Sequence, residues 1–138
     1  MDVLSDKVSR TLLTALRGLA LRQATIAGNI ANIDTPGFKA SEVTFEDQLQ
    51  RVIHQREDRP MPMTGSRDKH LSFGDDSFME VTPQIRPVSS SFRNDGNSVD
   101  IDKEMVTLAD TAIRYQGVAR LLTERLAYLR NIAYEGRR

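Results

Sequence analysis

Two apolar repeats, one near each end of the chain, constrain the fold more than any other feature of the sequence. In each repeat the side chains recur at alternating intervals of three and four residues, which is the spacing of a coiled-coil seam. The N-terminal seam contains Leu12, Leu16, Leu19, Gln23, Ile26, Ile30 and Ile33. The C-terminal seam contains Met105, Leu108, Ala112, Tyr115, Ala119, Leu122, Leu126, Leu129 and Ala133. The sequence therefore predicts two long helices that pair antiparallel, or nearly so, in a body about 50 Å long.

Each predicted helix carries more apolar surface than one partner helix would cover. Beside the N-terminal seam lie Leu13, Ala20, Leu21, Ala24, Ala27 and Ala31. Beside the C-terminal seam lie Ile101, Ile113, Val118, Leu121 and Ile132. Gly18 and Gly28 each cost about 1 kcal/mol relative to alanine inside a helix, so they indicate tight packing or bending. We expect neighbouring chains to bury the surplus apolar surface.

The chain is long enough for one domain and too short for two ordinary ones, at 138 residues. We predict a mainly α fold in which residues 1–40 and 99–138 together form a coiled-coil domain of terminal helices. Residues 41–98 form an intervening, partly irregular segment with a short helix and small β elements. Thr44 and Asp47 resemble a capping box, and they predict a short helix that ends near His54. Brief extended pieces or a small hairpin are expected within residues 78–86, and we expect neighbours to order residues 56–98.

The charge balance and composition argue against several classes of protein. Lys plus Arg and Asp plus Glu both number 19, so the net charge is zero and nothing indicates a nucleic-acid partner. The chain has no cysteine, which excludes a disulfide framework and a thiolate metal site. Charged and polar residues interrupt the longest apolar runs, so no transmembrane segment is predicted. A cleaved secretory signal is not predicted either.

The sequence contains no arrangement of residues that predicts catalysis. His54 and His70 are the only histidines, and neither has the spacing of a metal site. The acidic cluster between Asp95 and Asp102 matches a calcium loop poorly, and turns and helix caps explain it better. Nucleophile elbows and phosphate-binding loops are missing. We therefore predict that the chain is not an enzyme and binds no cofactor or metal.

Two turns are predicted beside the long helices. At the end of the first helix, Pro36 pushes its predecessor out of the helical region, and Gly37 supplies the positive φ of a type II turn. Asn32 is expected to bond back to backbone groups at the helix end, and Phe38 to anchor the outgoing chain. Residues 95–96 form an Asp-Gly turn before Asp100, which is expected to cap the last helix.

The run of residues 27–38 carries a family resemblance. Asn29 and Asn32 precede a Thr-Pro-Gly-Phe turn, and together they resemble the N-terminal signature of bacterial flagellar basal-body rod, hook and related axial proteins. The short chain and its residues 95–102 look most like the proximal rod proteins of that family. The resemblance implies a structural subunit of the periplasmic rod in the flagellar basal body. Such subunits self-assemble through their terminal helices into a tubular drive shaft that transmits torque.

The resemblance also implies partners and assembly residues. The implied partners are copies of the chain, other rod proteins, the rod adaptor FliE, the inner-membrane MS ring and the flagellar type III export apparatus. The residues expected to set the helix exit and to contact neighbours are Asn29, Asn32, Thr35, Pro36, Gly37 and Phe38. Those expected to hold the packing are Leu12, Leu16, Leu19, Ile26, Ile30, Met105, Leu108, Tyr115, Leu122, Leu126 and Leu129.

Two other interpretations remain open from the sequence. The first is a cytoplasmic coiled-coil adaptor or export chaperone, which would share the helices but would have a largely helical middle and form a closed dimer. The second is an enzyme such as a cell-wall hydrolase. This second interpretation is disfavoured because no pair of carboxylates is placed on a predicted scaffold.

Overall fold

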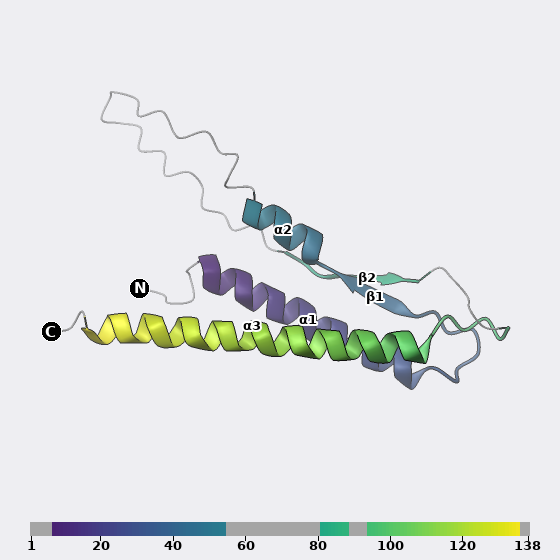
Figure 1. Ribbon diagram of the computed structural model, residues 1–138. Coiled ribbons are helices and arrows are strands. Elements are labelled where there is room, and N and C mark those ends of the chain that lie inside the picture. The colour runs from purple at the N-terminus through teal and green to yellow at the C-terminus, as the bar shows by residue number, and fades with distance from the viewer. Residues whose placement is uncertain (1–6, 55–80, 89–93, 136–138) are drawn as a thin grey trace, which may run out of the picture.

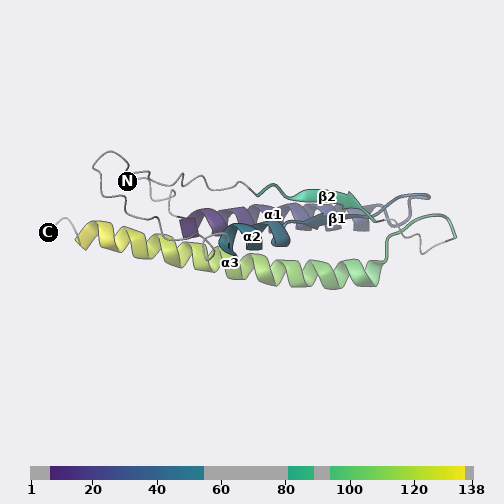
Figure 2. The ribbon, with the colours of Figure 1, turned by 90° about the horizontal axis from the view of Figure 1, so that it is seen from above.

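Two long helices dominate the computed structural model, which describes residues 7–54, 81–88 and 94–135 (Figure 1). Helix α1 spans Lys7–Ala31 and helix α3 spans Ile101–Glu135. The two helices lie side by side and run in opposite directions (Figures 1 and 2). At 35 residues against 25, α3 is the longer helix, and its C-terminal end projects past the described start of α1. The predicted pairing of the terminal helices is confirmed.

A short helix and two strands make up the described part of the middle. Strand β1 is Ser41–Thr44, helix α2 is Glu46–His54, and strand β2 is Gln84–Pro87. The strands pair antiparallel, with Ser41 opposite Pro87 and Thr44 opposite Gln84. Of the brief extended pieces or small hairpin expected within residues 78–86, an extended piece is confirmed at residues 84–86, and its partner is β1, about forty residues earlier. Residues 78–80 and His70 lie outside the described residues.

The start of α2 differs from the sequence prediction by one residue. The backbone N–H of Leu49 donates to the carbonyl oxygen of Phe45 at 3.0 Å, so Phe45 and not Thr44 precedes the first helical turn. Thr44 is instead the last residue of β1, where Val43 is buried and the two residues beside it are exposed. The alternation of buried and exposed side chains outweighs the capping pattern here.

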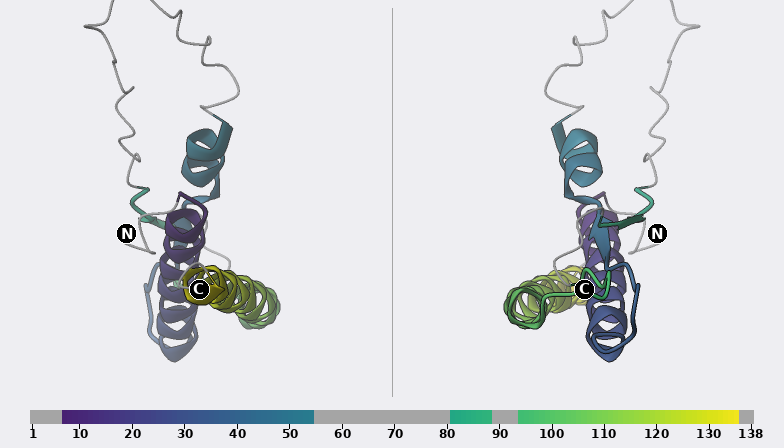
Figure 3. Two further views of the ribbon diagram at one scale, coloured as in Figure 1. Left: turned by 90° about the vertical axis from the view of Figure 1, so that its left-hand side faces the viewer. Right: turned by 90° about the vertical axis from the view of Figure 1, so that its right-hand side faces the viewer.

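The core lies where α1, β1, α2 and α3 meet. Leu19, Val43, Phe45 and Val81 form a buried cluster, and Tyr115 and Val118 of α3 pack against it. Viewed along the long axis, α2 and α3 pack on α1 at separate positions (Figure 3). The core is small for a chain of this length, and much of the apolar surface of α3 stays outside it.

The exposed apolar residues of α3 correct part of the predicted seam. Met105 is 52% exposed, and Ala133 is exposed as well. Met105 lies alongside α1, because its neighbour Glu104 is bonded to Asn29, but its side chain is off the face of α3 that packs on α1, the face of Glu104 and Thr111. Ala133 lies in the part of α3 that projects past the described start of α1. The seam of the single chain is shorter than the apolar repeat.

Candidate assembly site

The turn that follows α1 has the predicted geometry. The backbone N–H of Phe38 donates to the carbonyl oxygen of Thr35 at 3.3 Å, and Gly37 has a φ of 72°. These are the features of a type II turn with glycine at its third position. The side-chain amide of Asn32 donates to the carbonyl oxygen of Gly28 at 2.8 Å, as predicted. The helix end is thus fixed by residues close to it in the sequence.

A second turn, before α3, packs against the first. Gly96 has a φ of 80°, and the carbonyl oxygen of Asp95 accepts a hydrogen bond from the N–H of Gly37 at 3.0 Å. A Cβ atom on Gly96 would lie 3.7 Å from the Cα of Gly37, so the two backbones are in van der Waals contact. The ammonium group of Lys39 donates to the carbonyl oxygen of Gly96 at 2.8 Å. We call this contact between residues 29–41 and 95–104 the joint.

Asn97 is the centre of the joint, and no part of its side chain is exposed. Its amide nitrogen donates to the carbonyl oxygens of Asn32, Ile33 and Thr35, at 3.0, 2.9 and 2.9 Å. Its amide oxygen accepts a hydrogen bond from the N–H of Val99 at 2.7 Å. These three carbonyl groups lie in the turn that follows α1, which ends at Ala31. Asn97 therefore holds this turn from the far side of the sequence.

Ser98 adds two hydrogen bonds beside Asn97. Its hydroxyl oxygen accepts from the N–H of Ala40 at 2.8 Å, and its own N–H donates to the carbonyl oxygen of Phe38 at 3.1 Å. Ser98 and Ala40 are both buried. Because buried polar groups are costly when unpaired, these bonds fix the path of both segments.

Asn29 connects three elements, and only 2% of its surface is exposed. Its side-chain amide nitrogen donates to the carbonyl oxygen of Ser41 at 2.8 Å, and its side-chain amide oxygen accepts from the backbone N–H of Ser41 at 3.0 Å. The same amide nitrogen donates to a carboxylate oxygen of Glu104 on α3 at 3.1 Å. Asn29 therefore holds α1, the start of β1 and the first turns of α3 together.

The burial of Glu104 raises the pKa of its carboxyl group above the ordinary value. The hydrogen bond from Asn29 and the charge of Lys103 oppose this rise, whereas the charges of Glu42 and Asp100 add to it. Because its folded-state pKa is raised, Glu104 contributes most to stability when it is protonated. That contribution is complete below the unfolded-state pKa and is lost as the pH rises through the folded-state pKa.

Replacing Glu104 with glutamine is expected to raise stability slightly at neutral pH. The glutamine keeps an oxygen that accepts from Asn29 but carries no charge, and the gain should stay below about 1 kcal/mol since Glu104 is only partly buried. The gain should shrink as the pH falls through the raised pKa of the folded state and should be lost below 4.5, the ordinary pKa of the group. Urea unfolding at several pH values measures it. If the stability of the glutamine variant relative to wild type were lower at neutral pH than at acidic pH, the predicted direction of the effect would be wrong.

A second cluster fastens α2 to α1. The guanidinium of Arg22 pairs with the carboxylate of Glu46 at 2.6 and 2.7 Å and also donates to the carbonyl oxygen of Val43 at 2.8 Å. It lies 5.0 Å from the ring centre of Phe45, within cation–π range. Burial by itself would raise the pKa of Glu46, but the hydrogen bonds from Arg22 and from backbone N–H groups outweigh it and lower the pKa.

The structure gives the predicted assembly residues different surroundings. Asn29 is buried, Asn32 and Phe38 are half-buried, and the turn residues between them are exposed. Of the packing residues, Leu19 and Ile26 are buried and Met105 is exposed; the half-buried ones are Leu12, Leu16, Ile30, Leu108, Tyr115, Leu122, Leu126 and Leu129. Contacts of these residues with neighbouring chains stay a prediction.

Sequence reasoning missed Asn97, Ser98 and Arg22 as joining residues. The capping role of Asp100 was predicted and is confirmed, since its carboxylate accepts from the N–H groups of Asp102 and Lys103 at 3.0 and 3.3 Å. The only sequence pattern near Asn97 is the Asp-Gly turn that directly precedes it. This pattern predicts a turn but does not indicate which distant residues Asn97 binds.

Within residues 7–54, 81–88 and 94–135, no group of three or more His, Cys, Asp or Glu side chains is placed to hold a metal ion. Among the helices of that same described part, none has the length and hydropathy needed to cross a bilayer.

Comparison with known proteins yields consistent matches. A family model described as flagella basal body rod protein matches residues 10–39. The flagellar basal body rod protein FlgB of Borrelia hermsii is 42% identical over 99 residues, which cover 70% of this chain and 73% of that protein. FlgB of Bacillus subtilis (strain 168) is 31% identical over 93% of this chain and 94% of its own length. FlgB of Escherichia coli (strain K12) is 28% identical over 95% and 96%.

The fold and the joint define a helical structural subunit in which the two ends of the chain form one unit. The chain belongs to the family of the flagellar basal body rod protein FlgB. Its location is therefore the flagellar basal body, and the relatives that it matches are rod proteins rather than enzymes. Family membership favours the rod interpretation over the adaptor and the hydrolase.

Proposed function

We propose that this chain assembles with copies of itself and with other rod proteins into the proximal part of the tubular drive shaft that transmits torque through the periplasm. The observation that supports assembly most is the set of large apolar side chains that stay exposed on α3. It comprises Ile101, Met105, Val106, Ile113, Leu121, Tyr128, Ile132 and Tyr134. An exposed apolar surface of this extent is typical of an interaction site.

Burial of these side chains would drive the assembly. Each large apolar side chain that is removed from water contributes about 1.5–3 kcal/mol. Several such residues per interface offset the loss of translational, rotational and side-chain freedom on association. The terminal-helix domain of residues 1–40 and 99–138 would supply the contacts, and residues 41–98 would form the intervening segment.

The family supplies the finer parts of the proposal. The chain catalyses no reaction, leaves the cytoplasm through the flagellar type III apparatus, and contacts the rod adaptor FliE and the MS ring. In this proposal the exposed turn residues Thr35, Pro36 and Gly37 contact neighbouring subunits, whereas Asn29 and Asn97 act within the chain.

Met105→Asp tests the assembly proposal. Met105 is half exposed in the single chain, so the aspartate should change the free energy of unfolding by less than about 1 kcal/mol. In an assembled rod, the same change would bury an unpaired charge and abolish motility. Swimming assays and the recovery of the variant in purified basal bodies measure the effect. Met105→Leu keeps an apolar side chain of similar size and is the matched control.

Two outcomes would argue against the proposal. One is wild-type swimming with normal incorporation of Met105→Asp into basal bodies, which would mean that this face of α3 stays in water. The other is equal loss of motility in Met105→Leu, which would mean that the position is sensitive to any change rather than to charge.

A further inference from the structure

The small sheet has one edge on the outside of the molecule. Within the described residues the sheet consists of β1 and β2 alone. Figures 2 and 3 show β2 and α3 on opposite sides of α1. All residues of β2 are exposed, and Ile85 at its centre is 55% exposed. We call the side of β2 that faces away from β1 the open edge.

The hydrogen bonds of the sheet show which residues face the open edge. The N–H of Val88 donates to the carbonyl oxygen of Ala40 at 2.8 Å, in the register that sets Ser41 opposite Pro87. In an antiparallel pair of strands, hydrogen-bonded residue pairs alternate with non-hydrogen-bonded ones. Residues 84, 86 and 88 therefore direct their backbone groups toward β1, and residues 83, 85 and 87 direct theirs toward the open edge.

The other edge of the sheet is covered by α1. Ser41 and Val43 of β1 direct backbone groups away from β2, in agreement with the same alternation. The side-chain amide of Asn29 bonds both the N–H and the carbonyl oxygen of Ser41, and the guanidinium of Arg22 donates to the carbonyl oxygen of Val43 at 2.8 Å. Side chains of α1 thus take the place that a third strand would have beside β1.

Prolines occupy the positions of the open edge on both sides of Ile85. Pro83 and Pro87 face the open edge, whereas the positions that face β1 hold Gln84, Arg86 and Val88. Proline has no backbone N–H, and its ring fills the space where that group would be. Pro87 costs the sheet no bond to β1, because its pair with Ser41 is a non-hydrogen-bonded one. Among residues 83–88, Ile85 alone offers an N–H group to the open edge.

We propose that Pro83 and Pro87 prevent the open edge from pairing with the same edge of a second copy. Without the prolines, two open edges would pair antiparallel about Ile85, with residue 83 of one copy opposite residue 87 of the other. Such a pair needs N–H donors from residues 83, 85 and 87 of each copy. The prolines remove about two thirds of its hydrogen bonds and place their rings between the strands.

The open edge is in other respects suited to strand pairing. Ile85 is β-branched, and residues of this type are enriched in strands. An exposed strand with unpaired backbone groups and an apolar side chain is a template for aggregation, and proline on the edge is one way in which proteins block it. Because α1 covers β1, the open edge is the part of the described sheet to which another chain could add a strand.

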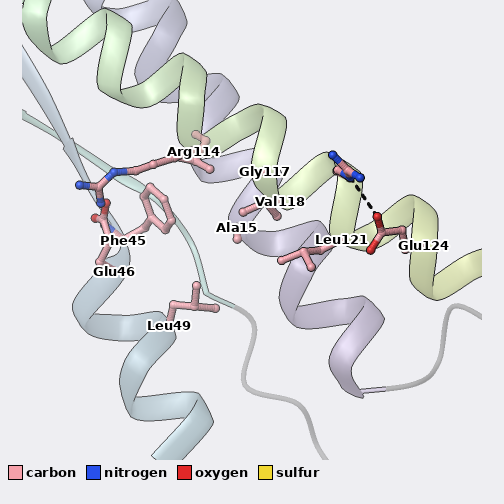
Figure 4. Close-up of a pocket in the computed structure, with 11 residues that line it drawn as sticks. Ala15, Phe45, Glu46, Leu49, Arg114, Gly117, Val118, Leu121 and Glu124 are labelled. Atoms are coloured by element: carbon pink, nitrogen blue, oxygen red, sulfur yellow. Dashed lines mark hydrogen bonds and ion pairs between the residues drawn. The ribbon is translucent and has the colours of Figure 1, made fainter.

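Blocking the open edge restricts the association of copies to the helical surfaces. Helix α3, with its exposed apolar side chains, lies across α1 from β2 (Figure 3). A chiefly apolar groove of about 720 Å³ lies between α1, α2 and α3, with Phe45 and Leu49 on one side and Val118 and Leu121 on the other (Figure 4). The inference concerns the sheet alone, so it goes beyond the rod function and does not rest on it.

Amide hydrogen exchange of the purified full chain, measured by NMR, tests the open edge directly. In wild type the N–H of Ile85 should exchange at close to the rate of an unstructured amide, at every protein concentration. The N–H of Val88 is bonded to Ala40, so it should exchange at least about tenfold more slowly and serves as the internal reference.

Pro83→Thr combined with Pro87→Thr gives the open edge its missing N–H groups. Copies of this double variant should associate through their sheets, and exchange at Ile85 should slow at least about tenfold as the concentration rises. The infrared band of intermolecular β-structure should grow with it. Each single variant should show a smaller effect. Circular dichroism checks that the variants keep their helices.

Gln84→Thr is the matched control, because it adds a threonine to the same strand at a position whose N–H already faces β1. The proposal fails if Ile85 exchanges slowly in wild type, if the folded double variant forms no pairs between sheets, or if Gln84→Thr associates equally. Should the double variant unfold, the single variants and the wild-type exchange rates decide. Association of wild type through its helices leaves the N–H of Ile85 in water, so failure of this inference and failure of the rod function are distinguishable.

Discussion

Replacing Asn97 with alanine is expected to lower the free energy of unfolding by about 3–4 kcal/mol, because it leaves buried carbonyl groups without a donor. Asn32, Ile33 and Thr35 would all lose the same amide nitrogen at once. The N–H of Val99 would also lose its acceptor. A loss of this size is a large fraction of the stability of a small domain. Urea unfolding followed by circular dichroism measures it.

Two further variants make the Asn97 prediction specific. Asn94→Ala removes an exposed amide from the same segment and should change stability by less than about 0.5 kcal/mol. Asn97→Asp has nearly the same shape but replaces the donor with an acceptor that faces three carbonyl oxygens, so it should destabilise at least as much as alanine. Equal stability of Asn97→Ala and Asn94→Ala would show that water replaces the amide at no cost.

Gly18→Ala and Gly28→Ala are expected to change stability in opposite directions, although both add one methyl group to α1. At Gly18 the new Cβ would lie 2.8 Å from three ring carbons of Phe45, which is too close without movement of the ring. At Gly28 nothing lies within 4 Å. We expect a loss of about 2 kcal/mol at Gly18 from overpacking and a gain of about 1 kcal/mol at Gly28 from helix propensity.

The two glycine variants are measured in the same urea unfolding experiment, and each serves as the control for the other. A double variant, Gly18→Ala with Phe45→Leu, should recover part of the loss because the smaller side chain makes room for the methyl group. Stabilisation by both alanines would mean that Phe45 moves aside freely. The cluster around Phe45 would then contribute little to holding α2 on α1.

The sequence predicts those features that neighbouring residues determine. The period of the apolar residues predicts α1 and α3, Pro36 and Gly37 predict the turn between α1 and β1, and Asp100 predicts the start of α3. In each case the interacting groups lie within one or two turns of one another along the chain. Local propensity and local hydrogen bonding are therefore sufficient.

The features that the sequence does not predict depend on distant partners. Nothing near Asn97 indicates that it binds the carbonyl groups of a turn more than sixty residues earlier. Nothing near Ser41 indicates that it pairs both with Asn29 and with a strand beyond residue 80. An apolar repeat also does not tell which face of a helix packs on its partner, and Met105 matched the seam although it lies off the face of α3 that meets α1.

The dependence of the turn after α1 on Asn97 sets an order for folding. Whenever the polypeptide emerges with its N-terminus first, the carbonyl groups of this turn have no partner until a residue in the last third of the sequence is present. Contacts of such long sequence separation form slowly and late. An incomplete chain that stops before residue 97 should therefore remain loosely structured. The subunit should reach its folded structure in one late step, after residue 97 is present.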